Sequence, residues 1–172
     1  MRLHSLNITH FKNYGTASFD FDQRIVSLTG PNGIGKTNLL DAIHYLCMTK
    51  SYFTTYDKRA VQRGETFFRI EGRFLDDGDI TDVSVVYQKR KGKEVTVDGK
   101  KVDRFSDHIG SIPVVVVAPD DQELINGGSK GRRKWLDAAI SQQYPEYLSF
   151  LMQYKKLLKQ RNALLKKAAE RG

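Results

Sequence analysis

The sequence has 172 residues, 40% of them hydrophobic, which is enough for one packed domain or for part of a larger protein. Its formal net charge of +8 favours an acidic partner, with nucleic acid as the first candidate. One cysteine excludes an internal disulfide and a cysteine-based zinc site, and no apolar run has the length of a signal peptide or membrane span. We therefore expect a cytoplasmic protein without a membrane partner.

The N-terminal part of the chain predicts strands followed by a helix. Residues 2–11 and residues 16–21 alternate apolar and polar side chains, which indicates two strands joined by a turn at Lys12-Asn13-Tyr14-Gly15. Residues 24–29 form a short apolar stretch typical of a buried strand. Residues 38–46 have the spacing of an amphipathic helix.

Between that third strand and that helix lies a complete phosphate-binding loop of the pattern G-x-x-x-x-G-K-[ST]. Its glycines allow backbone angles that a Cβ would resist, so that successive N–H groups can surround an anion at the positive end of the helix. Lys36 is predicted to reach the β- and γ-phosphates, and the Thr37 hydroxyl to bind Mg²⁺. The predicted nucleotide contacts are Gly30, Pro31, Asn32, Gly33, Ile34, Gly35, Lys36, Thr37 and Asn38.

The middle of the chain predicts an antiparallel region and then another strand. Residues 67–102 alternate in short runs separated by turns, and Asp98-Gly99 is a strong two-residue hairpin signal. The β-branched run at residues 113–118 predicts a strand buried on both faces.

The loop Pro119-Asp120-Asp121-Gln122 follows that run, and two interpretations of it remain open. In the first, Asp120 or Asp121 completes the Mg²⁺ shell, and the chain is a complete small P-loop phosphotransferase. In the second, the loop with Gln122 only borders the metal site, as a Gln-containing loop does in ATP-binding-cassette ATPases; the β-hairpins favour this interpretation. A third hypothesis is a DNA-binding or scaffold module that acts without nucleotide and has a vestigial phosphate loop.

The C-terminal part of the chain predicts two helices, at residues 135–144 and 145–169. Apolar side chains on the second recur at intervals of three, four and seven, and we expect a returning helix outside this chain to cover them. Arg132 and Arg133 either contact DNA phosphates or pair with acids such as Asp137. The candidate DNA contacts are Arg132, Arg133, Lys155 and Lys159.

Four segments of the sequence carry a family resemblance. They are Leu6-x-Ile8-x-x-Phe11-Lys12-Asn13-Tyr14, the loop and helix from Gly30 to His44, Leu124-Ile125-Asn126-Gly127-Gly128-x-x-x-Arg132-Arg133-x-x-Leu136-Asp137, and Leu157-Leu158-Lys159-Gln160-Arg161-Asn162-Ala163-Leu164-Leu165. Together they resemble the RecF family of bacterial recombination mediators, relatives of the SMC-type cassette ATPases. The phosphate loop is shared by all SMC-like ATPases, whereas the last two segments are much more particular.

The resemblance implies an α/β fold. It consists of a P-loop NTPase lobe of the ABC and SMC type, with a mixed sheet and an antiparallel β-subdomain, and the start of a helical arm domain. Residues 1–128 would form the lobe and residues 129–172 the beginning of the arm. We expect the chain to be the N-terminal part of a longer protein, because the family's signature and Walker B motifs are not found in it.

The resemblance also implies a function in DNA replication and repair and in the SOS response. Proteins of this family bind ATP, dimerise through it and hydrolyse it slowly. They bind DNA at single-strand gaps and act with RecO and RecR to load the recombinase. Lys12 stands where the family usually has Arg, so Lys12 and its neighbour Asn13 join the predicted nucleotide contacts. A lysine keeps the charge but loses the planar fork of arginine.

Overall fold

The fold is described from a computed structural model that covers residues 1–170, apart from the side chains of residues 120 and 123. The chain divides into two compact units, Met1–Val116 and a second unit that begins at Val117. No helix in the described part of the chain is both long and apolar enough to cross a membrane.

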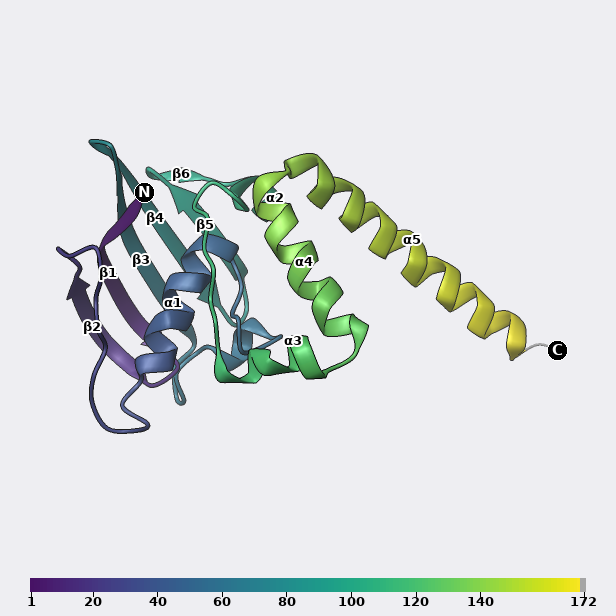
Figure 1. Cartoon of the computed structure of the whole chain (residues 1–172), viewed down its shortest axis with the longest axis horizontal. Coiled ribbons are helices and arrows are strands. Elements are labelled where there is room, and N and C mark those ends of the chain that lie inside the picture. Colours follow the sequence, from purple (N-terminus) through teal and green to yellow (C-terminus); the bar gives the residue numbers. More distant parts are fainter. Residues whose placement is uncertain (171–172) are drawn as a thin grey trace. The chain divides into compact units, whose positions relative to one another are not determined.

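The first unit is built on a six-stranded sheet in the order β2-β1-β3-β4-β5-β6 (Figure 1). All pairings between these strands are antiparallel. Tight turns with a positive φ at Asp77 and Asp98 join β3 to β4 and β5 to β6, which confirms the Asp-Gly hairpin signal. The strands are β1 (Arg2–Phe11), β2 (Tyr14–Asp20), β3 (Phe67–Asp76), β4 (Asp79–Gln88), β5 (Gly92–Val97) and β6 (Lys100–Lys101).

One face of the sheet is apolar because alternate side chains of its strands point the same way. Helix α1 (Lys36–Met48) packs against this face (Figure 1). Gly72 on β3 permits the close approach, since a Cβ there would lie 2.5 Å from Cδ1 of Leu46. The opposite face is polar and carries ion pairs such as Arg73 with Asp82 at 2.8 Å. The buried face is formed by Leu6, Ile8, Phe68, Ile70, Phe74, Val83, Val85 and Val95.

The P-loop lobe and its antiparallel region are as predicted, but the expected mixed sheet is not observed. Residues 24–29 and 113–118 were expected to be buried strands, and neither segment belongs to the sheet. Ile25 is 87% exposed and Val115 is 76% exposed. A β-branched run indicates only a preference for extended backbone, whereas a strand needs a neighbouring strand to complete its ladder.

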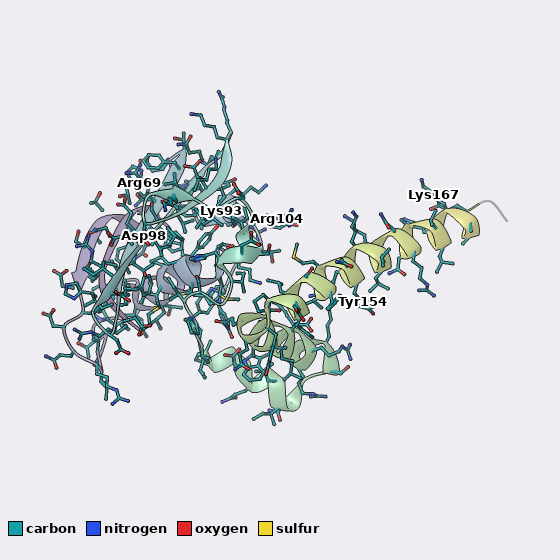
Figure 2. All side chains as sticks on the ribbon, turned by 90° about the horizontal axis from the view of Figure 1, so that it is seen from above. Arg69, Lys93, Asp98, Arg104, Tyr154 and Lys167 are labelled. Atoms are coloured by element: carbon teal, nitrogen blue, oxygen red, sulfur yellow. The ribbon has the colours of Figure 1, made fainter. Side chains whose placement is uncertain are left out.

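The C-terminal end of α1 is held by a cation from the sheet. Lys93 on β5, labelled in Figure 2, donates to the backbone carbonyl of Thr49 at 2.5 Å and pairs with Asp57 at 3.0 Å. Asp57 lies in a short 3₁₀ helix (Asp57–Arg59) and also accepts a hydrogen bond from the hydroxyl of Tyr45. A positive charge at this end of a helix opposes the partial negative charge of the helix dipole.

Two buried histidines also bind backbone carbonyls around this end of α1. Nε2 of His108, in α2 (Phe105–His108), lies 2.7 Å from the carbonyl of Leu46, and Nδ1 of His44 lies 3.0 Å from that of Lys50. Burial lowers the pKa of both imidazoles, although these hydrogen bonds act in the opposite direction. Both histidines are therefore expected to be neutral in the folded protein near pH 7.

Acidification is expected to destabilise the protein as the pH falls below about 6.5, the usual histidine pKa. The unfolded chain then binds protons that buried His44 and His108 resist, which favours unfolding by up to about 1.4 kcal/mol per pH unit for each histidine. Urea denaturation between pH 7.5 and 5.5 measures this slope. His108→Gln replaces the imidazole N–H with an amide N–H that does not titrate, and it should flatten the slope. An equal slope in that variant would contradict the assignment.

The second unit is helical and contains a helical hairpin. The side chain of Asp137 joins its two helices, because it accepts from the Tyr147 hydroxyl at 2.7 Å and pairs with Lys155 at 3.2 Å. In the last helix, Tyr154 and Lys167, both labelled in Figure 2, are exposed. The described elements are a 3₁₀ turn (Pro119–Gln122), α3 (Glu123–Asn126), α4 (Ser129–Gln143) and α5 (Pro145–Ala169).

Helix α5 has the predicted boundaries, and Pro145 stands in its first turn, where its missing N–H costs nothing. Helix α4 begins at Ser129, six residues before the predicted start at Trp135, and it therefore includes the basic residues between Lys130 and Lys134. The apolar stripe of α5 is exposed from Tyr154, at 61%, to Leu165, at 53%. The expected covering helix remains a prediction.

Candidate nucleotide-binding site

The three loop glycines have the backbone angles that the motif requires. The φ angles of Gly30, Gly33 and Gly35 are 139°, 84° and 117°, a region that residues with a Cβ rarely adopt. A Cβ on Gly35 would also lie 2.7 Å from the side-chain nitrogen of Asn13. At Gly33 there is nothing within 4 Å of the corresponding position. The loop is therefore closely packed at Gly35 and open at Gly33.

The N-terminus of α1 is suited to an anion. It has no side-chain cap and no acidic residue in its first turn, so its N–H groups and its partial positive charge are available to a ligand. At the opposite end the carbonyl of Thr49 accepts a hydrogen bond from Lys93, which also pairs with Asp57. Since protein groups compensate only the C-terminal end of this helix, the phosphate group predicted from the sequence fits its N-terminal end.

Two functional side chains belong to this first turn. The Lys36 amine folds back over the loop and donates to the carbonyls of Gly30 at 2.7 Å and Pro31 at 2.8 Å. Thr37 follows it and is exposed. A flexible ammonium and an exposed hydroxyl on one helical turn are the groups that a triphosphate and its Mg²⁺ require.

The turn between β1 and β2 contacts the loop directly. The Asn13 amide donates to the carbonyl of Ile34 at 3.0 Å and accepts from the Asn38 amide at 2.7 Å. The Tyr14 hydroxyl donates to the carbonyl of Gly35 at 3.2 Å, and burial raises the pKa of Tyr14, which keeps the hydroxyl protonated. Asn13 and Asn38, both predicted to contact nucleotide, thus contact each other, and Tyr14 was not predicted at all.

Lys12 lies in the same turn, but its amine faces the interior. Its Nζ is 2.6 Å from Oδ2 of Asp41, a residue of α1 with no exposed surface. Asp41 also accepts from the Ser51 hydroxyl and the Tyr52 backbone N–H, both at 2.7 Å. Sequence reasoning missed Asp41, although a carboxylate on the apolar face of a helix is a signal for a buried partner.

The acidic Mg²⁺ ligand remains a prediction. Among the described residues, no group of three or more His, Cys, Asp or Glu side chains could hold a metal ion. The side chain of Asp120 lies outside the described residues, and Gln122 is exposed. Asp121 turns back on its own loop, where its carboxylate accepts from the backbone N–H of Ala118 at 2.6 Å.

The predicted DNA contacts of the second unit have differing environments. Arg132 donates to the carbonyl of Gly127 at 2.8 Å, and Arg133 donates to the Ser129 hydroxyl at 2.8 Å. The predicted pairing of these arginines with Asp137 is not formed; Lys155 takes that position because α5 brings it alongside. Lys159 is exposed.

Asp137 keeps its charge in this arrangement. Its partial burial would raise its pKa, but hydrogen bonds from Tyr147 and Lys155 and the nearby charges of Lys155 and Arg133 outweigh burial, so the pKa is lowered. Lys155 therefore pairs with Asp137 across the two helices. Lys159 is exposed and is the better placed of the two lysines to contact a phosphate.

Comparison with known proteins gives consistent results. A family model described as an AAA domain matches residues 5–171. The DNA replication and repair proteins RecF of Flavobacterium johnsoniae and Chlorobium limicola are 47% and 42% identical to the chain; the matches cover 96% and 99% of it, and 46% and 47% of those proteins. The chain thus spans about half the length of the curated relatives it matches.

Solved structures of RecF and of an SMC ATPase are also similar to this chain. The structure of the recombination mediator protein RecF with ATP, of the RecFOR pathway, matches 96% of this chain and 44% of its own, with 32% identity and a TM-score of 0.89. A structure of an SMC ATPase matches 79% of this chain with 18% identity and a TM-score of 0.64, which shows a shared fold.

Proposed function

The chain belongs to the AAA domain family and is a homologue of the RecF proteins, and we propose that it forms the ATP-binding part of a RecF-type DNA replication and repair protein. The observation that carries this proposal is the phosphate loop: three glycines with positive φ lead into an uncapped helix N-terminus, in a fold that matches a RecF structure with ATP. The predicted loop contacts and Lys36 would hold the phosphates.

The loop is held in this conformation by the chain's own residues. Asn13 and Tyr14 bind the carbonyls of Ile34 and Gly35, which keeps the intervening backbone from turning those oxygens toward an anion. Thr37 would supply a hydroxyl to Mg²⁺, which offsets the phosphate charge when bound. We propose that Asn13 acts on the loop, while Gly30 to Thr37 touch the nucleotide.

The wider function proposed is that of the RecFOR pathway. The net charge of +8 supports DNA as a partner, and the RecFOR pathway of the similar RecF structure supports RecO and RecR as partners. Gap junctions as the DNA target follow from the family resemblance alone. Because the chain spans about half of its relatives' length, we assign ATP-dependent dimerisation and slow hydrolysis to the whole protein. Residues 129–172 would begin its helical arm, and its compartment would be the cytoplasm.

Calorimetric titration of the 172-residue chain with ATP and Mg²⁺ tests the proposal. Saturable binding of one ATP per chain is expected, with negligible turnover. The absence of binding at ~1 mM ATP, the upper end of ordinary enzyme affinities, would remove the nucleotide function. Brisk hydrolysis by this chain alone would instead support a self-sufficient enzyme.

A further inference from the structure

We propose that residues 53–59 form a surface for single-stranded nucleic acid, where exposed aromatic rings stack on unpaired bases and neighbouring cations contact phosphates. The proposal rests on the DNA-binding function proposed above and assigns part of that function to residues of the first unit. We call these residues the aromatic segment. It lies between helix α1 and strand β3 in the sequence.

The backbone of the aromatic segment is fixed by inward contacts. At its start, the Ser51 hydroxyl accepts hydrogen bonds from the N–H groups of Phe53 at 3.1 Å and Thr54 at 2.9 Å. In its middle, the Asp57 carboxylate faces inward to Tyr45 and Lys93. Just beyond it, Ala60 is fully buried and its carbonyl accepts from the Lys12 N–H at 2.7 Å.

These anchors leave most of the remaining side chains of the segment facing solvent, although the Thr54 hydroxyl is buried. Phe53 is 41% exposed and Tyr56 is 57% exposed, although rings of this size are usually well buried. Lys58 and Arg59 are also exposed. Because the backbone is already ordered, binding would cost little conformational entropy in this segment.

The aromatic rings and the cations are close to each other. The Lys58 amine and the Arg59 guanidinium lie 5.8 and 5.5 Å from the centre of the Tyr56 ring. Stacking platforms for single strands combine these two elements: a ring for the base and a cation for the phosphate beside it.

The charge of this surface is positive. Its one acid, Asp57, is neutralised internally by Lys93 at 3.0 Å. Among the ion pairs formed by described residues, none involves Lys58, Arg59 or Arg63. A single strand fits better than a duplex, because only unpaired bases offer a face to a protruding ring.

Fluorescence anisotropy with a labelled oligothymidine and a blunt duplex of equal length tests the proposal. Tyr56→Ala should weaken binding of the single strand about tenfold or more and leave duplex binding nearly unchanged. Arg59→Ala should lower the slope of log K against log salt by about 0.7 for the single strand. Two matched controls, Tyr154→Ala for an exposed ring and Lys100→Ala for an exposed cation, should have much smaller effects.

Three results would overturn the proposal. If Tyr56→Ala and Tyr154→Ala weakened single-strand binding equally, the aromatic segment would have no special role, while the proposed DNA binding itself would stand. Weakened ATP binding with unchanged oligonucleotide binding would assign the rings to the adenine. Absence of any DNA binding by the wild-type chain would reject both this surface and the proposed DNA function in this chain.

Discussion

Lys36→Ala is expected to abolish calorimetrically detectable ATP binding. The Lys36 ammonium is the one charged side chain of the loop from Gly30 to Thr37, and it already lies within 2.8 Å of two loop carbonyls. Two charge-assisted hydrogen bonds to phosphate, at about 1.5–3 kcal/mol each, correspond to a loss of roughly 100-fold or more. The affinity for ATP of the wild-type chain and of the variant, titrated under the same conditions, measures this effect.

The variant should fold normally, because the Lys36 amine bonds only to carbonyls of an exposed loop. Its thermal midpoint should therefore match that of the wild type, and Lys100→Ala, which removes an exposed charge on β6, should leave ATP affinity unchanged. If Lys36→Ala bound ATP as tightly as the wild type, the loop would not be the nucleotide site.

Lys12→Met is expected to destabilise the protein by about 3–5 kcal/mol, because it leaves a buried carboxylate without its cation. Asp41 has no exposed surface, and the Lys12 side chain is 12% exposed. Adding Asp41→Asn to that variant should restore much of the stability, since the amide carries no charge and its single oxygen can still accept from the Tyr52 N–H. Urea denaturation of the wild type, both single variants and the double variant gives the coupling energy.

The same four proteins decide what Lys12 does. If Lys12 positions the turn through Asp41, the double variant recovers ATP affinity together with stability. If Lys12 contacts the γ-phosphate, stability returns while ATP affinity stays low. The exposed pair of Arg73 and Asp82 is the matched control, and its cycle should show a far smaller coupling because both side chains are about half exposed. An equally small coupling for Lys12 and Asp41 would refute their role as a buried pair.

The phosphate loop and its neighbouring elements could be predicted from local sequence patterns. The glycine spacing, the apolar helix after it and the hairpin signals are local patterns, and the structure has the corresponding elements in the expected places. Residues 24–29 and 113–118 show the limit of this reasoning. Their composition favours strands, but membership of a sheet depends on a neighbour, which no local pattern specifies.

The sequence by itself determined that this chain carries a phosphate loop before a helix, an antiparallel β region and a basic helical end, because each depends on residue spacing within one element. Only the tertiary structure decided which residues meet across elements. It placed Asn13 and Tyr14 on the loop, paired Lys12 with Asp41, and turned Asp57 inward so that Tyr56 faces outward. Such contacts depend on how distant segments pack together, and the sequence does not state that packing locally.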